Sequence, residues 1–311
     1  IFSLVVPRCA EILQGNSDIS EIIFQPETRG LNNFLRSFKL ISLLRKKRFD
    51  IVFLLTASFT RSLLIFLAGI PLRVGYKKGR KSIFLNKKIN PSKVDVHRAE
   101  HFLGLTHFLG VEKERGCYFF VSSDDEYWAD NFLKENKIDK NDFLLILNPG
   151  GNWELKRWPL ENFALLGDKF IQKYKAKVII SGSKKDKELA EQISVLMQNR
   201  PILAAGKTTL KQLGALFKKT DLVIANDSGP MHIAVALDCK VIALFGPTSF
   251  RITGPYSEQK NWSVIQKGGN YPLPCYGSVC PQERSMQAIS VDEVLAKIDI
   301  NNSSVYNKRQ I

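Results

Sequence analysis

Residues 221–248, DLVIANDSGPMHIAVALDCKVIALFGPT, decide the fold class of this 311-residue chain. Two short apolar runs rich in Val and Ile enclose a polar loop, and such runs are typical of strands buried on both faces of a parallel sheet. The loop residues 226–229 end the first run, and Pro230 follows where the first residue of a helix belongs. The stretch therefore predicts a strand, a sharp loop, a short helix and a second strand.

The polar loop of this stretch has the composition of an anion-binding site. Gly229 lets the backbone approach a ligand closely, and the free N–H groups and dipole of the new helix face the space above the carboxyl end of the sheet. Asp227, Ser228 and His232 add polar side chains to the same rim. Asp and Ser are also ordinary helix N-caps, but capping alone does not call for four polar or turn residues followed by a histidine one turn later. We therefore favour a ligand site at this loop.

Length and composition are those of a soluble globular protein with two domains of ordinary size, since 44% of the residues are hydrophobic and 24% are charged. The longest apolar run, residues 63–70, is far shorter than the roughly 20 residues of a membrane-spanning helix. No signal peptide is recognisable, and the five Cys form no regular framework. These features predict a cytoplasmic protein.

The formal net charge of +15 calls for an anionic partner or a compositional explanation. Lys outnumbers Arg in most basic clusters, and aromatic residues are not interleaved as platforms for bases, so we expect no nucleic-acid partner. Two explanations stay open. One is an anionic membrane surface, near which each basic residue gains ~1 kcal/mol, and the other is a Lys-rich composition without specific meaning. The clusters lie at residues 45–48, 77–81, 87–88 and 184–185.

Apolar runs and amphipathic stretches alternate along the chain and predict α/β domains with parallel, doubly wound sheets. The charged stretch 137–142 lacks an apolar face, and we expect the linker between two domains there. We predict a first domain at residues 1–140, a second at 141–300 and a loosely ordered polar tail at 301–311. The expected strands of the first domain are residues 4–6, 21–24, 49–55, 73–76 and 117–123, and its helices are 31–45, 60–70, 96–109 and 127–137. Besides residues 221–248, the expected strands of the second domain are 143–148, 177–182 and 201–205, and its helices are 159–174, 187–198, 208–220 and 291–299.

Two further motifs follow strands of the second domain. In PGGNWELKRWP, residues 149–159, Gly150 and Gly151 permit close backbone approach, and Lys156 and Arg157 come just before a helix. They predict a cationic mouth at the carboxyl edge of the sheet, beside the Asp227 loop, which suits a diphosphate.

The second of these motifs, SGSKKD at residues 181–186, ends in Asp186. An acidic residue near such a strand end can accept hydrogen bonds from ribose hydroxyls. The same residue is equally well explained as the exposed start of a helix. Both interpretations stay open on the residues alone.

In this order and spacing, NPGGNWELKRWP, SGSKKD, NDSGPMHIAVAL and ALFGPT resemble glycosyltransferase family nine, the ADP-heptose:lipopolysaccharide heptosyltransferases. In the first half, LRKKRFDIVFLL, RSLLIFLAGIPLRVGY and HRAEHFLGLTHFLG are similar to the acceptor domain of the family. The resemblance covers essentially the whole chain. It implies the GT-B fold, in which two Rossmann-like domains face each other across a cleft.

The resemblance also assigns roles to the motif residues. Lys156 would neutralise the donor diphosphate, Asp186 would hold the adenosine ribose and Asp227 would bind heptose hydroxyls. The implied activity is inverting transfer of heptose from ADP-heptose to the lipopolysaccharide inner core, at the cytoplasmic face of the bacterial inner membrane. The implied donor-binding residues besides Asp186 are Gly150, Gly151, Ser228, Gly229 and His232.

We expect this transfer to need neither a metal nor a cofactor. Charge builds on the β-phosphate as ADP leaves, and Lys156 and the helix N-terminus after Ser228 are placed to stabilise it. The chain contains no Asp-x-Asp pair, the usual holder of Mg²⁺-diphosphate in the other large glycosyltransferase fold class.

The start of the sequence departs from the family pattern. Members usually begin with a strand and a Ser-Leu-Gly-Asp loop whose Asp serves as general base, whereas Ile1 opens a segment that matches the second strand of the family. We therefore expect an incomplete N-terminus, a base outside this chain, and donor binding by the chain as given without useful transfer. Vigorous transfer would instead point to a base such as Glu27 or Asp95.

Other candidate ligands and functions have weaker support. His97 and His101 have metal-ligand spacing but no third ligand, so we interpret them as surface or packing residues, and we interpret Cys275 and Cys280 as structural, without zinc. Three alternative functions stay open. They are a family-nine transferase with another donor sugar or acceptor, a non-catalytic nucleotide-sugar binding protein, and a sugar-nucleotide epimerase on the same fold.

Overall fold

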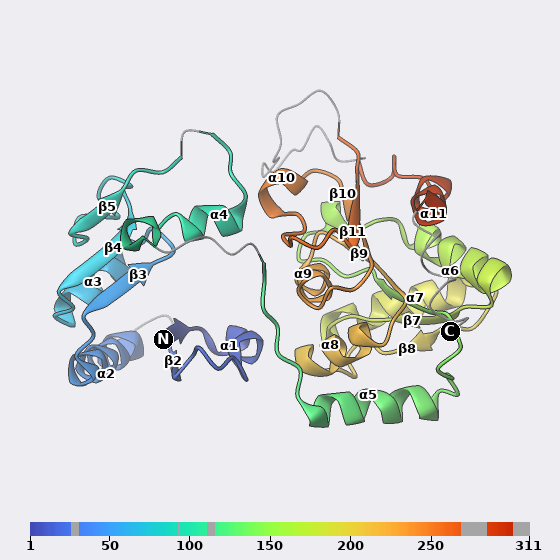
Figure 1. The fold of residues 1–311 in the computed structure, drawn as a ribbon, viewed down its shortest axis with the longest axis horizontal. Helices are drawn as coiled ribbons and strands as arrows, with labels where there is room; N and C mark the ends of the chain where they lie inside the picture. The colour runs from blue at the N-terminus through green and yellow to red at the C-terminus, as the bar shows by residue number, and fades with distance from the viewer. Residues whose placement is uncertain (26–30, 93, 111–115, 269–284, 301–311) are drawn as a thin grey trace. The chain divides into compact units, whose positions relative to one another are not determined.

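The computed structural model describes residues 1–25, 31–92, 94–110, 116–268 and 285–300 (Figure 1). Its contacts divide the chain into two units. The first comprises Ile1–Ala10 and Ser17–Glu114, and the second comprises Glu11–Asn16 and Arg115–Ile311. Each unit combines helices with parallel sheets, so the predicted α/β fold class is confirmed.

The second unit is built on a six-stranded sheet with the order β11-β10-β9-β6-β7-β8, in which every neighbouring pair is parallel. Its central strands are runs of Val, Ile and Leu, and all five residues of β6, β9 and β10 are buried. Such runs form central strands because both of their faces are covered. The strands are β6 (Leu144–Asn148), β7 (Lys177–Ile180), β8 (Ile202–Leu203), β9 (Leu222–Asn226), β10 (Val241–Phe245) and β11 (Trp262–Gln266).

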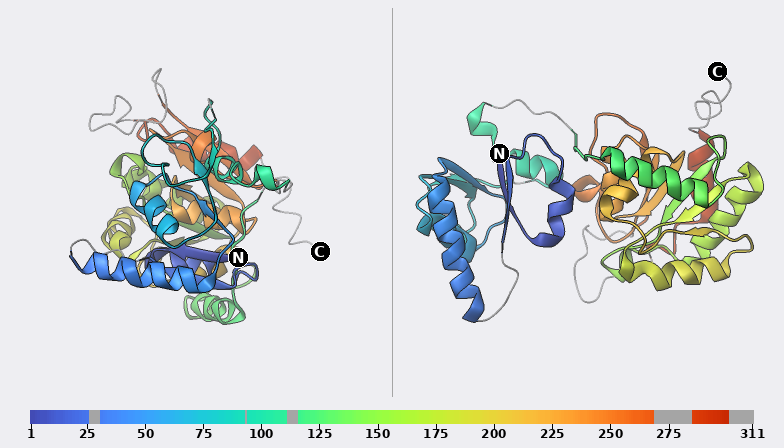
Figure 2. Two further views of the ribbon diagram at one scale, coloured as in Figure 1. Left: turned by 90° about the vertical axis from the view of Figure 1, so that its left-hand side faces the viewer. Right: turned by 90° about the horizontal axis from the view of Figure 1, so that it is seen from below.

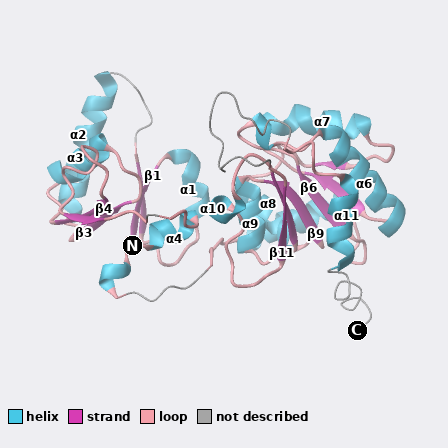
Figure 3. Ribbon diagram, turned by 90° about the horizontal axis from the view of Figure 1, so that it is seen from above, coloured by secondary structure: helices cyan, strands magenta, loops and turns pink. Residues whose placement is uncertain are grey.

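Helices cover both faces of this sheet (Figure 3). Successive strand residues point to opposite faces, so Leu145 and Leu147 pack against α6, α7 and α11, whereas Leu144 and Ile146 pack against α5, α8 and α9. Burial of each fully buried Leu or Ile side chain stabilises the fold by roughly 1.5–3 kcal/mol. The two layers of helices therefore fix the positions of the strand ends. The helices are α5 (Ser123–Glu135), η2 (Glu154–Lys156), α6 (Leu160–Tyr174), η3 (Lys184–Asp186), α7 (Lys187–Leu196), α8 (Leu210–Lys218), α9 (Gly229–Ala236), α10 (Phe250–Thr253) and α11 (Val291–Ile300).

The first unit contains a parallel pair of strands and a parallel three-stranded sheet with the order β3-β4-β5. Its core gathers Ile23, Leu40, Leu44, Ile65 and Leu85. The long helix α2 is blue in Figure 2. The strands are β1 (Phe2–Val5), β2 (Glu21–Phe24), β3 (Ile51–Leu54), β4 (Leu72–Tyr76) and β5 (Lys87–Ile89), and the helices are α2 (Leu31–Lys47), α3 (Phe59–Leu67), α4 (Arg98–Leu103) and η1 (His107–Leu109). One division between the units falls within α1 (Pro7–Leu13), after Ala10.

Residues 117–123 do not form the strand that their sequence predicts. Phe119 instead packs into the core beside α8, and Ser123 already belongs to α5. The helix begins here because Ser122 and Asp125 form a capping box. The expected helix at residues 96–109 is also divided, into α4 and η1, and Gly110 ends it with a φ of 69°.

The division between the units lies before α5, whereas the sequence placed the linker at residues 137–142. The reason is packing, because Ala129 and Phe132 of α5 share a core with Leu213 and Phe217 of α8. The predicted tail, residues 301–311, lies outside the described residues. Within the described ranges, no helix has the length and apolar composition needed to cross a bilayer.

Candidate functional site

A pocket of about 550 Å³ opens in the second unit, where loops follow the carboxyl ends of β6, β7 and β9. Parallel strands present their carboxyl ends at one edge of a sheet, which is where α/β proteins bind ligands. The structure brings all the predicted site residues to the wall of this one pocket. They are Lys156, Asp227, Gly150, Gly151, Asp186, Ser228, Gly229 and His232.

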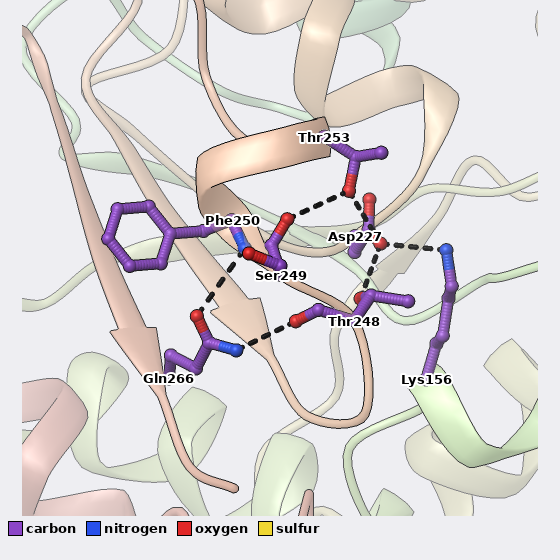
Figure 4. Close-up of polar contacts among 7 residues, drawn as sticks. All are labelled: Lys156, Asp227, Thr248, Ser249, Phe250, Thr253 and Gln266. Carbon is purple, nitrogen blue, oxygen red and sulfur yellow. Dashed lines mark hydrogen bonds and ion pairs between the residues drawn. The ribbon is translucent and has the colours of Figure 1, made fainter. Parts of the chain in front are cut away.

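Lys156 and Asp227 form an ion pair, with the Lys156 Nζ atom 2.7 Å from the Asp227 Oδ2 atom (Figure 4). The lysine comes from η2 and its side chain is 21% exposed, whereas the carboxylate follows β9 and is 6% exposed. The sequence predicted that both residues lie at the carboxyl edge of the sheet, but it did not predict that they form an ion pair. Removing either partner would leave the other charge partly buried and uncompensated, which is costly.

Two threonines also donate to the Asp227 carboxylate. The Thr248 Oγ1 atom lies 2.7 Å and the Thr253 Oγ1 atom 3.5 Å from Asp227 Oδ2. Thr248 is almost completely buried, in the loop after β10. The sequence places Thr248 at the end of the stretch 221–248 but gives no sign of this contact, because the loops after β9 and β10 meet only once the two strands pair.

Two buried asparagines hold the loops of the pocket together. Asn226, the last residue of β9, donates from its Nδ2 atom to the Pro149 carbonyl (2.8 Å) and accepts from the Trp158 backbone N–H (3.2 Å). Asn148, the last residue of β6, donates to Ser181 Oγ (3.0 Å). Sequence reasoning missed both, although a signal was present, since each apolar run ends in Asn.

Asp186 also lines the pocket and lies close against Gly150. A Cβ atom added to Gly150 would lie 2.9 Å from the Cγ and Oδ2 atoms of Asp186, so only glycine allows this approach. The same carboxylate accepts from the Ser183 backbone N–H (2.9 Å) and hydroxyl (2.6 Å). Asp186 thus belongs to a capping box at the start of η3, but it is half-buried instead of exposed and its carboxylate lines the pocket.

The N-terminus of α9 faces this pocket through Ser228, Gly229 and Pro230. Ser228 is the N-cap residue, but its side chain makes no capping hydrogen bond and instead donates to Asn148 Oδ1 (3.4 Å). A Cβ atom added to Gly229 would meet nothing within 4 Å. The first turn of α9 thus offers N–H groups and the positive end of its dipole to an anion in the pocket.

The first unit uses its candidate histidines for packing and capping. His97 Nδ1 accepts from the Ala99 N–H (3.1 Å) at the start of α4. The His101 ring stacks on Tyr76 at 4.0 Å, and burial, with Arg98 nearby, lowers the pKa of His101. Among the described residues, no three His, Cys, Asp or Glu side chains gather as metal ligands. Cys275, Cys280 and Glu27 lie outside the described residues.

Comparisons with known proteins agree on one family. The sequence model of glycosyltransferase family 9 (heptosyltransferase) matches residues 37–285. The lipopolysaccharide core heptosyltransferase OpsX of Haemophilus influenzae is 31% identical over 225 residues, which are 70% of this chain and 63% of OpsX, less than two thirds of that relative.

Two solved structures show the same fold. The glycosyl transferase family 9 protein of Veillonella parvula superposes with a TM-score of 0.83 at 23% identity, over 96% of this chain and 87% of that one. The Escherichia coli ADP-heptose lipopolysaccharide heptosyltransferase II superposes with a TM-score of 0.78 at 24% identity, over 96% and 88%. Since the family model covers most of the chain, this protein belongs to glycosyltransferase family 9.

Proposed function

We propose that this protein transfers heptose from ADP-heptose to the lipopolysaccharide core. The observation that carries the proposal is the pairing of Lys156 with Asp227 beside the N-terminus of α9, inside a pocket whose 550 Å³ lies within the roughly 300–1,000 Å³ of small-molecule sites. The names of its relatives support it, since OpsX is called a lipopolysaccharide core heptosyltransferase and the Escherichia coli structure an ADP-heptose heptosyltransferase.

The proposed chemistry uses groups that already line the pocket. As the bond from heptose to ADP breaks, the Lys156 ammonium and the N–H groups of α9 stabilise the charge on the departing diphosphate. Asp186 accepts hydrogen bonds from the ribose, and Asp227 accepts them from heptose hydroxyls. An acceptor hydroxyl attacks the anomeric carbon from the face opposite ADP, which inverts its configuration, and the proton of the hydroxyl passes to a general base.

We propose that a divalent metal is not needed. Lys156 and the start of α9 supply positive charge at the place where a metal-diphosphate holder would act, and the chain lacks an Asp-x-Asp pair. Transfer should therefore proceed equally well in EDTA and in Mg²⁺. If EDTA abolishes heptose transfer and added Mg²⁺ restores it, metal independence is refuted, whereas the proposed transfer reaction still stands.

The reaction itself is tested by incubating the full-length gene product with ADP-heptose and heptose-deficient lipopolysaccharide. Mass spectrometry should find one added heptose on the core, and NMR should find an inverted anomeric configuration. UDP- and GDP-sugars in place of ADP-heptose should give no product. Transfer from one of those donors would favour another family-nine specificity, and tight ADP binding without any transfer would favour a binding protein.

We further propose that the basic first unit holds the enzyme at the anionic cytoplasmic face of the inner membrane. Lys77, Lys78, Arg80 and Lys81 are exposed in the loop before β5, and the neighbouring Ile83 is 57% exposed. Cations beside a protruding apolar side chain suit acidic headgroups over an acyl layer. In the described residues of this loop, no carboxylate is present to offset the charge.

Liposome sedimentation tests this location. Vesicles with anionic lipid should retain the protein at low salt and release it as salt rises, because screening acts over ~10 Å at 0.1 M. The charge reversal Arg80→Glu/Lys81→Glu should weaken retention more than Lys134→Glu/Lys140→Glu, which changes the charge equally on exposed residues of the second unit. Equal retention by neutral vesicles, or tighter binding to duplex DNA, would argue against a membrane-surface role.

A further inference from the structure

Thr248 supports the Asp227 carboxylate from behind the pocket wall. Its hydroxyl donates to Asp227 Oδ2 at 2.7 Å, the same oxygen that Lys156 contacts at 2.7 Å. Asp227 lines the pocket, and Thr248 is not among its lining residues. Figure 4 shows that all the contacts drawn to Asp227 go to this one oxygen, so Oδ1 is the carboxylate oxygen left for a ligand.

Thr248 is itself held by the last residue of β11. The Gln266 Nε2 atom donates to the Thr248 carbonyl at 2.7 Å, and the Gln266 Oε1 atom accepts from the Phe250 N–H at 3.4 Å (Figure 4). Gln266 pairs in register with Phe245 of β10, so the sheet fixes where this amide lies. A continuous chain of contacts thus runs from the edge of the sheet to the Asp227 carboxylate.

Lys156 and Thr248, the two donors 2.7 Å from Asp227, differ in how many hydrogen bonds they can donate. An ammonium carries three N–H groups, whereas a hydroxyl carries one. Lys156 can therefore contact Asp227 and a phosphate oxygen together, and a diphosphate draws its ammonium toward the ligand. The single Thr248 proton is committed to Asp227, and it holds the carboxylate when the lysine shifts.

We propose that Thr248, anchored by Gln266, is a positioning residue that keeps Asp227 Oδ1 directed at the sugar while Lys156 engages the diphosphate. This inference rests on the proposed transfer reaction. A positioning role of Thr248 requires the hydroxyl of its side chain, whereas a packing role would require only the volume of that side chain.

The test is Thr248→Val, which removes the hydroxyl and keeps the shape of the side chain. We expect kcat to fall about 10- to 100-fold, since small misplacements of reacting groups cost on this order, while the calorimetric Kd for ADP changes less than about threefold. Thr248→Ser should restore kcat. Wild-type kcat in Thr248→Val, or a loss that Thr248→Ser does not recover, would overturn the proposal.

Gln266→Met provides a second variant at the other end of the chain of contacts. If Gln266 acts through Thr248, this variant lowers kcat in the same direction, and the double variant with Thr248→Val costs no more than Thr248→Val alone. Fully multiplicative losses would show that the two residues act separately. Thr220→Val is the matched control. Thr220 lies just before β9, and its hydroxyl donates to the Leu144 carbonyl at 2.8 Å. The same substitution there removes one hydroxyl hydrogen bond away from the pocket and should leave kcat unchanged.

A crystal structure of Thr248→Val with ADP gives a readout that does not depend on activity. We expect the Asp227 carboxylate to rotate from its wild-type position and follow Lys156, and to return in Thr248→Ser. A carboxylate that keeps its place without the hydroxyl disproves the positioning role, whatever the transfer rate. If the wild-type, full-length gene product transfers no heptose, the proposed function is instead disproved.

Discussion

Replacing Lys156 by methionine should lower the turnover of heptose transfer about 10²- to 10³-fold and weaken ADP binding much less. A group that stabilises charge developing in the transition state contributes on this order, and its loss appears in kcat. The ammonium lies 2.7 Å from Asp227 and lines the pocket beside the start of α9. Steady-state kinetics with ADP-heptose, together with calorimetry for ADP, measures both effects.

Controls separate charge stabilisation from a structural role of the lysine. Lys169→Met removes an ion pair of 3.1 Å with Asp292 at the surface and should leave turnover unchanged. The paired variant Lys156→Met/Asp227→Asn removes the uncompensated carboxylate, and it should recover thermal stability without recovering turnover. If the paired variant regains turnover, Lys156 serves only to neutralise Asp227, and its assignment to the diphosphate is wrong.

The central strands of the second unit could be predicted from the sequence within a few residues, because strands buried on both faces leave an unbroken apolar run. β6, β9 and β10 illustrate this, since every one of their residues is buried. Residues 117–123 have a similar apolar character, but in the described part of the chain no strand pairs with them. Local composition cannot show whether a partner strand exists, so this prediction was wrong.

Weakly apolar elements escaped prediction for a related reason. β5 is the three-residue strand KKI, which forms because it pairs with β4, and β11 is a half-buried edge strand, WSVIQ. Neither has an apolar pattern strong enough to stand out from a loop. The start of α5 could have been found, however, since Ser122 and Asp125 have capping-box spacing.

The composition of the candidate site could be predicted, but its internal contacts could not. Glycines, Lys156, Asp186 and Asp227 each follow a strand in the sequence, and parallel strands bring such ends together. Which side chains then pair depends on loop conformation. The Lys156–Asp227 pair joins residues 71 positions apart, and the Thr248–Asp227 contact joins residues 21 positions apart, across two different loops. These contacts therefore required the structure.

Replacing Trp158 by alanine should destabilise the second unit by about 3–5 kcal/mol, the usual cost of deleting a buried Trp side chain. Trp158 is completely buried, and its ring meets Phe163 edge-on with centroids 5.0 Å apart. Its Nε1 atom donates to the Ile289 carbonyl at 2.9 Å, which ties the segment before α6 to the segment before α11. For a unit of this size the melting transition should fall by about 10 °C, as calorimetry of the whole chain would show.

Two variants grade the contributions of Trp158. Trp158→Phe keeps a ring but leaves the Ile289 carbonyl without its donor, so its cost should be smaller, about 1–3 kcal/mol. Tyr127→Ala removes an aromatic side chain that is 69% exposed and should change the transition little. Because Trp158 follows Lys156 by two positions and its side chain packs in the core beneath that loop, Trp158→Ala should also weaken ADP binding. A melting transition within 2 °C of the wild-type value would contradict the view that this side chain holds the Lys156 loop against the sheet.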